Sequence, residues 1–130
     1  MKKLLVSGSR TITDRAKVFQ ALDFMISEML MGEEVTIIEG GAKGVDTLAR
    51  EFAIEQKIPY EEHPADWDKN GRAAGYIRNV EMVKEADVAL IIWDGKSKGT
   101  AHAMKICEKK GVKYLLKMMG GSNAESKEQR

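Results

Sequence analysis

The feature that most constrains the fold is an alternation between short apolar runs and longer segments with helical periodicity. The run Val88–Trp93, VALIIW, is apolar at every position, which is typical of a strand covered on both faces. Segments with apolar residues three or four positions apart separate such runs and predict helices. This alternation builds right-handed βαβ units, so we predict an α/β fold with a mostly parallel, doubly wound, three-layer sheet. We expect about five strands in the order 3-2-1-4-5, at residues 3–7, 35–39, 59–63, 88–93 and 112–117.

Helix signals fill the segments between these runs. Asp14 is a predicted N-cap, apolar residues follow it at helical spacing as far as Leu30, and Gly32 ends that helix. Three more helices are expected at residues 45–56, 73–85 and 99–110, and a polar loop is expected at residues 64–72. We predict a single Rossmann-like domain over residues 1–118 and a disordered polar tail over residues 119–130.

The composition is that of a globular protein without bulk charge. Of 130 residues, 43% are hydrophobic and 32% are charged, and the formal net charge is +1. A chain so balanced has no long-range attraction for nucleic acid or membranes, so any anion site must be a local arrangement. The lone cysteine, Cys107, and the lack of a secretion signal or a bilayer-length apolar run predict a cytoplasmic protein with no membrane partner.

The stretch EGGAKGVDTLA, residues 39–49, joins a predicted strand to a predicted helix. Gly40, Gly41 and Gly44 allow a sharp turn or a close approach to a ligand, and Lys43 adds a cation beside the helix N-terminus. Two interpretations stay open, a phosphate-binding loop and an ordinary strand-to-helix turn. The spacing matches neither a Walker A loop nor GxGxxG. Asp46 is either a structural residue of the first helical turn or an acceptor for a ribose hydroxyl.

Two other strand ends should meet this stretch, because the carboxyl ends of parallel strands share one rim of the sheet. Ser9 can donate to a phosphate oxygen and Arg10 can pair with it, although a solvated surface arginine is the alternative. Asp94 follows the central apolar strand. Gly99 and Thr100 begin the last helix, where Thr100 is a ligand group or only an N-cap.

The segment between residues 66 and 79 supplies the remaining candidates. Trp67 lies in a polar setting, where it either stacks on a base or anchors the loop. Arg72, Arg78 and Asn79 are candidate ligand contacts, and the alternative is that Arg78 and Asn79 face solvent. His63 and His102 have no cysteine or acid at metal-ligand spacing, so we expect no metal and no cofactor.

Four ordered motifs carry a family resemblance: SGSR, GGAKGVD, ADWDKNGRAAGYIRNVEMV and WDGKSKGTAHAM. They resemble the SLOG superfamily in its YspA, or cpYpsA-related, branch over about residues 3–117. Lonely Guy phosphoribohydrolases and the Rossmann domain of the DNA-processing protein DprA are more distant relatives. The resemblance implies a Rossmann-like domain that binds nucleotides or nucleotide-derived ligands. Carried over by motif, the pocket residues are Ser9, Arg10, Gly41, Lys43, Gly44, Arg78, Asn79, Gly99 and Thr100.

One departure from the related enzymes bears on catalysis. Lonely Guy enzymes have a Gly-Thr-x-x-Glu helix start whose glutamate serves N-glycosidic cleavage, and Ala103 stands at that place here. Alanine offers no charge or acid–base help, so we expect a binding module or sensor for a phosphate-bearing small molecule. The alternatives are a nucleoside-monophosphate phosphoribohydrolase using Arg78 and, more weakly, a DprA-like single-stranded nucleic-acid binder. Relatives associate, so a homo-oligomer, a dimer, is expected.

Overall fold

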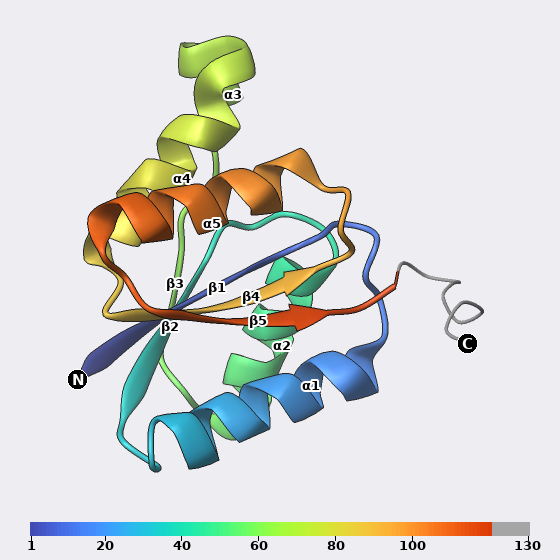
Figure 1. Cartoon of the computed structure of the whole chain (residues 1–130), viewed down its shortest axis with the longest axis vertical. Coiled ribbons are helices and arrows are strands. Elements are labelled where there is room, and N and C mark those ends of the chain that lie inside the picture. The colour runs from blue at the N-terminus through green and yellow to red at the C-terminus, as the bar shows by residue number, and fades with distance from the viewer. Residues whose placement is uncertain (121–130) are drawn as a thin grey trace.

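A five-stranded sheet lies between two helical layers in the computed structural model, which describes residues 1–120 (Figure 1). Every neighbouring pair of strands runs parallel, and the order is β3-β2-β1-β4-β5. The predicted α/β class and strand order are therefore confirmed. The strands are β1 (Lys2–Gly8), β2 (Val35–Glu39), β3 (Tyr60–Glu62), β4 (Val88–Trp93) and β5 (Tyr114–Met118).

Two pairs of long helices cover the sheet. Helices α1 and α2 pack against each other on one face, and α4 and α5 do so on the other (Figure 1). Asp14 caps α1 as predicted, because its side chain accepts a hydrogen bond from the Lys17 amide at 3.1 Å. The helices are α1 (Arg15–Phe24), α2 (Val45–Gln56), α3 (Trp67–Asn70), α4 (Ala74–Glu85) and α5 (Lys98–Lys110).

Two segments differ from the sequence predictions. Residues 64–72, expected to be a polar loop, contain the short helix α3 and most of a 3₁₀ turn, Gly71–Ala73. Asp66 caps α3 by accepting from the Lys69 amide at 3.1 Å, and four polar-flanked residues are too few to show a helical period. The first helix also changes form, because α1 passes into a π-helical turn, Met25–Met29, before Gly32.

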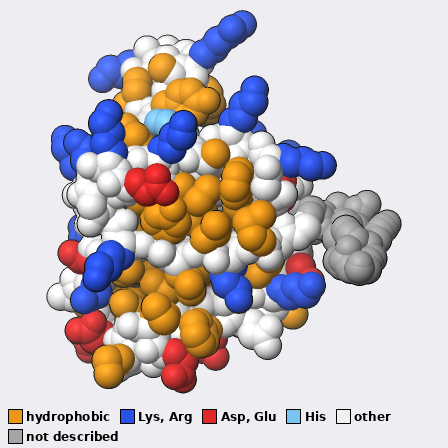
Figure 2. Space-filling model, viewed as in Figure 1, with side chains coloured by type: hydrophobic (Ala, Val, Ile, Leu, Met, Phe, Trp, Pro, Cys, Tyr) orange, Lys and Arg blue, Asp and Glu red, His pale blue; other side chains and the backbone are white. Residues whose placement is uncertain are grey.

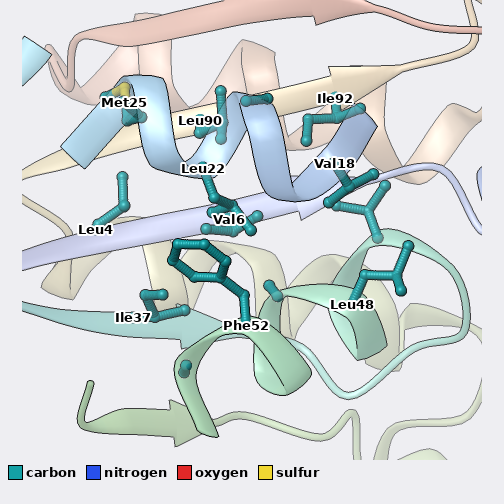
Figure 3. Close-up of a cluster of buried hydrophobic side chains, with 14 of the residues drawn as sticks. Leu4, Val6, Val18, Leu22, Met25, Ile37, Leu48, Phe52, Leu90 and Ile92 are labelled. Atoms are coloured by element: carbon teal, nitrogen blue, oxygen red, sulfur yellow. The ribbon is translucent and has the colours of Figure 1, made fainter. Parts of the chain in front are cut away.

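The core consists of two apolar clusters separated by the sheet. Successive strand residues point to opposite faces, so Leu4 and Val6 of β1 join the cluster under α1 and α2, while Leu5 joins the other. Figure 3 shows Val18 and Leu22 of α1 and Phe52 of α2 closing over β1 and β4. Buried residues of the second cluster are Leu5, Ile38, Met82, Val83, Ala89, Ile91, Met104 and Cys107.

The strand β5 forms one edge of the sheet and leaves apolar side chains in solvent. Leu116 is 38% exposed and Met118 is 58% exposed. Figure 2 shows hydrophobic side chains gathered across the face on which β5 is the nearest strand. Among residues 1–120, no helix has both the length and the apolar character needed to cross a bilayer. Most of the predicted disordered tail, from residue 121, lies outside the described residues.

Candidate functional site

A cleft of about 580 Å³ opens at the rim where β1, β2 and β4 end. Its walls come from the loops after those strands, from α3 and from the first turns of α4 and α5. Cations outnumber carboxylates in the lining. The cations are Arg10, Arg72, Arg78 and Lys96, and the carboxylates are Asp46 and Asp94. Two aromatic side chains, Trp67 and Tyr76, complete the chemistry of the wall.

Most of the predicted site residues line this cleft. The structure places nine of them there: Arg10, Asp46, Trp67, Arg72, Arg78, Asn79, Asp94, Gly99 and Thr100. Five others lie close by in the chain but outside the lining: Ser9, Gly40, Gly41, Lys43 and Gly44. The topology therefore brings together the strand-end motifs that the sequence places far apart.

The backbone amides of the glycine-rich stretch are used within the protein. The Gly40 and Ala42 amides donate to Asp46 Oδ2 at 3.1 and 3.3 Å, and the Gly41 amide donates to Glu39 Oε1 at 2.6 Å. These three groups point at carboxylates of the same segment. The stretch therefore contributes to the cleft through Ala42 and the Asp46 side chain.

The glycines of this stretch allow close packing of neighbouring segments. A Cβ on Gly40 would lie 2.5 Å from Arg78 Nη1. A Cβ on Gly44, where φ is +76°, would lie 2.5 Å from the Ser9 carbonyl oxygen. Ser9 is itself fully buried, and its hydroxyl accepts from the Asp94 amide at 3.0 Å. Ser9 and these glycines thus hold the loops of the rim in place.

Arg78 and Asn79 connect three segments around the cleft. Arg78 Nη1 donates to the Gly40 carbonyl at 2.5 Å, and Nε donates to Asn79 Oδ1 at 3.1 Å. Asn79 Nδ2 donates to the Gly99 carbonyl at 3.1 Å. Asn79 is 5% exposed, so the solvent-facing alternative for it is wrong. Arg78 Nη2 donates no hydrogen bond to any group of residues 1–120 and lies beside Gly75.

The start of α5 is closed by side-chain caps. Asp94 Oδ1 accepts from the Lys96 and Ser97 amides at 2.8 and 2.9 Å, and Asp94 Oδ2 accepts from the Thr11 hydroxyl at 2.9 Å. Partial burial opposes ionisation, but these hydrogen bonds prevail and lower the pKa of Asp94. The N-cap of α5 is Ser97, and Thr100 lies one turn inside the helix.

Two buried carboxyl groups flank the glycine-rich stretch. Burial raises the pKa of Asp46 to about 6, although the Ala42 amide and Arg78 favour its charged form. Burial also raises the pKa of Glu39 to about 8; the Gly41 amide opposes this rise, and the charges of Asp46 and Glu62 add to it. Glu39 is fully buried and its Oε2 atom has no hydrogen-bond partner. Two buried carboxyl groups with raised pKa values, those of Glu39 and Asp46, therefore lie in this part of the rim.

Several residues of the lining were not among the predicted site residues. Tyr76 stacks at 4.4 Å between ring centroids against His102, an approach that depends on the packing of α4 on α5. Lys96, Ser97 and Thr11 belong to strand-end loops and could have been found from that position alone. Trp67 is 53% exposed, so it is not a buried loop anchor.

A possible set of metal ligands lies outside the cleft. Glu61, His63 and Glu85 each place one ligand atom within 4.8 Å of the others. Glu61 lies two residues before His63 in the sequence, but Glu85 comes from α4, so the spacing along the chain did not show the complete group. Lys3 Nζ already pairs with Glu61 and Glu85 at 3.3 Å each, so a cation of the protein is bound to both carboxylates.

Ala103 is fully buried on α5 and does not line the cleft. The carboxylates that do line it are Asp46 and Asp94. Asp66 and Asp68 belong to the α3 segment, and neither lies in the lining. Any acid–base role in this cleft would therefore fall to one of the two lining carboxylates.

Solved structures with the same fold support the observed topology. The DNA processing protein A of Streptococcus pneumoniae has a TM-score of 0.68 at 16% identity, over 89% of this chain and 50% of that one. The protein TM1055 has a TM-score of 0.68 at 21% identity, over 93% of this chain and 77% of that one. The DNA processing protein A of Helicobacter pylori, which binds single-stranded DNA, has a TM-score of 0.62 at 19% identity. The match covers 88% of this chain and 64% of that one. The chain thus spans about half the length of the first of these proteins.

Sequence comparison gives the family. The Gene 61 protein of Mycobacterium phage D29 is 36% identical in an alignment of 121 positions that covers 88% of this chain and 95% of that protein. The family model for the YspA, cpYpsA-related SLOG family matches residues 2–70. This match covers the strand-end motifs of β1 and β2 and reaches α3. The chain therefore belongs to the YspA, cpYpsA-related SLOG family.

Proposed function

We propose that this protein binds a phosphate-bearing, nucleotide-like small molecule in the cleft at the carboxyl rim of its sheet. The observation that carries the proposal is the convergence of Arg10, Arg72 and Arg78 on one cleft. Guanidinium groups form paired, charge-assisted hydrogen bonds with phosphate oxygens. With a net charge of only +1 in the whole chain, such a local excess of cations is a feature of the site and not of the composition.

The size and the aromatic lining of the cleft also suit a nucleotide. Ligand pockets in proteins enclose roughly 300–1,000 Å³, and this cleft falls in that range at about 580 Å³. Trp67 and Tyr76 offer ring faces on which a base can stack. Family membership supports the same class of ligand, because the resemblance implies nucleotide or nucleotide-derived ligands.

The available chemistry favours binding without turnover. At the position where the related hydrolases have their glutamate, this chain has Ala103, whose methyl group is buried. Asp94 has both carboxylate oxygens engaged by donors of the protein. We therefore place the protein among binding modules or sensors.

A thermal-shift screen with one cleft variant tests this proposal. Adenosine monophosphate (AMP) and ADP-ribose at millimolar concentration should raise the melting temperature of the wild-type protein by several degrees, since ligand at 100 times its Kd stabilises by about 2.7 kcal/mol. Arg72 is exposed in the cleft wall, so Arg72→Ala should fold normally and lose most of the shift. Lys69→Ala is the matched control, because Lys69 lies on α3 outside the lining. The absence of a shift with every phosphate compound would contradict the proposal.

A phosphoribohydrolase activity is the second candidate, and the buried carboxyl of Asp46 favours it. A pKa raised to about 6 in a cleft that also holds Arg78 is typical of acid–base sites. Release of free adenine from AMP, followed by chromatography, measures this activity. Turnover that disappears in Asp46→Asn would support it, and the absence of adenine release would rule it out.

A further inference from the structure

Asp46 has one carboxylate oxygen that accepts no hydrogen bond from the described part of the chain, residues 1–120. Its hydrogen bonds from Gly40 and Ala42 both end on Oδ2, and Oδ1 receives none from residues 1–120. Asp46 is only 5% exposed. Among the described residues, Glu39 Oε2 is the one fully enclosed side-chain polar atom without a partner, so Asp46 Oδ1 is not sealed in the core. Because Asp46 lines the cleft, Oδ1 opens into it.

A ligand that fills the cleft displaces water from Asp46 Oδ1, and it must supply a donor or leave this oxygen buried without one. Arg78 and Arg10 act on Asp46 through their charge, and the hydrogen bonds of Arg78 within residues 1–120 go to Asn79 and to the carbonyls of Gly40 and His63, not to Asp46. Asp94, the other carboxylate of the cleft, has donors on both oxygens. Of the carboxylate oxygens in the lining, Asp46 Oδ1 is therefore the one that remains for a ligand donor.

The chemistry of a phosphate-bearing ligand decides which donor fits. A doubly ionised phosphate monoester, the main form above pH 6, has no proton to give and is repelled by an ionised Asp46, so the donor must be another part of the ligand. Arg10, Arg78 and Asp46 line the same cleft, and a Cβ on Gly40 would lie 2.5 Å from Arg78 Nη1 and 3.0 Å from Asp46 Oδ2. A phosphate bound by these arginines would therefore lie near this carboxylate. In a nucleotide the group joined directly to the phosphate is the sugar, whereas the base lies farther away, toward Trp67 or Tyr76.

We propose that Asp46 Oδ1 accepts a hydrogen bond from a sugar hydroxyl of the bound ligand, so that the cleft selects hydroxylated ribose phosphates. This inference rests on the proposed binding of a nucleotide-like molecule. It adds a specificity that phosphate binding alone does not give. A ligand lacking the hydroxyl would bury Asp46 Oδ1 without a donor, which weakens its binding.

Calorimetric titration with two nucleotides tests the inference. The probes are AMP and 2′,3′-dideoxyadenosine monophosphate, which share the base and the phosphate and differ only in the sugar hydroxyls. The wild-type protein should bind AMP at least about tenfold more tightly, as expected for a hydrogen bond to a charged group. In Asp46→Asn the amide oxygen can still accept from Gly40 and Ala42, but an NH₂ group replaces the free acceptor, so the ratio should fall at least threefold.

The control is Asp68→Asn, which removes the same charge from α3 outside the lining and should leave the ratio unchanged. Equal dissociation constants for the two nucleotides in the wild-type protein would overturn the inference and leave the proposed function standing. A preference for AMP that survives unchanged in folded Asp46→Asn would also overturn it. Failure of both nucleotides to bind would instead count against the proposed function. If Asp46→Asn does not fold, the wild-type ratio alone decides.

Discussion

Glu39 shows how one buried residue can link the rim to pH. Its side chain is fully enclosed, and its pKa rises from 4.5 to about 8 because burial disfavours the charge. The folded protein therefore holds a proton that the unfolded chain releases near pH 4.5. The contribution of Glu39 to the free energy of unfolding is fully present below pH 4.5. It falls by up to about 1.4 kcal/mol per pH unit as the pH rises toward 8.

Glu39→Gln should remove this loss. Glutamine can still accept from the Gly41 amide, and it has no proton to release. Urea denaturation of both proteins at pH 6.5 and pH 9 measures the effect. The wild-type protein and the variant differ only at residue 39, so the difference between their pH dependences comes from Glu39. We expect the free energy of unfolding of the wild-type protein to fall more between these pH values than that of the variant. Parallel pH dependence would show that Glu39 is ionised in the folded protein at neutral pH.

Two glycines of the rim should respond differently to a methyl group. A Cβ on Gly44 would lie 2.5 Å from a backbone oxygen at a φ of +76°, whereas a Cβ on Gly99 meets nothing within 4 Å. We expect Gly44→Ala to lower the free energy of unfolding by about 2 kcal/mol or more, and Gly99→Ala to leave it unchanged or slightly raised. Denaturant titration compares the two, and equal effects would contradict the close approach at Gly44.

Among the elements of the fold, α4 connects the glycine-rich stretch to the start of α5. Arg78 donates to the Gly40 carbonyl and to Asn79, and Asn79 donates to the Gly99 carbonyl. Arg78→Ala removes the donor to the Gly40 carbonyl and the charge that faces buried Asp46. We expect a loss of about 2–4 kcal/mol in stability and faster hydrogen exchange at residues 40–44. Arg72→Ala, an exposed cleft arginine, is the control and should change neither. Unchanged exchange in Arg78→Ala would show that α4 does not hold this loop.

The same elements show what sequence can predict. The apolar run Val88–Trp93 and the helical periods predicted the strands and the long helices, because each of these elements carries its own local signal. The strand order followed from the Rossmann-like arrangement expected for five alternating strands, and the structure has that order. The rim was predictable too, since parallel strands end together. What could not be predicted was the use of each group: whether the Gly40 amide points at a ligand or at Asp46 depends on side-chain positions that no local pattern encodes. Helix α3 was missed because it is a single capped turn.

At the scale of the whole molecule, the dimer expected from the sequence remains a prediction. The edge strand β5 leaves Leu116 and Met118 exposed, on the apolar face shown in Figure 2. An unpaired edge with apolar side chains is a surface on which chains associate. Light scattering after gel filtration should give twice the 14.5 kDa chain mass, and a monomer at all concentrations would refute the dimer.

The fold positions the chemistry of the cleft at one end of the sheet, where three loops and two helix starts meet. In the proposed function this cleft binds a phosphate-bearing nucleotide. A crystal structure of the protein grown with AMP shows where such a ligand binds. We predict electron density for the phosphate among Arg10, Arg72 and Arg78, with the sugar beside Asp46. Nucleotide bound elsewhere on the protein, with this cleft filled only by solvent, would contradict it.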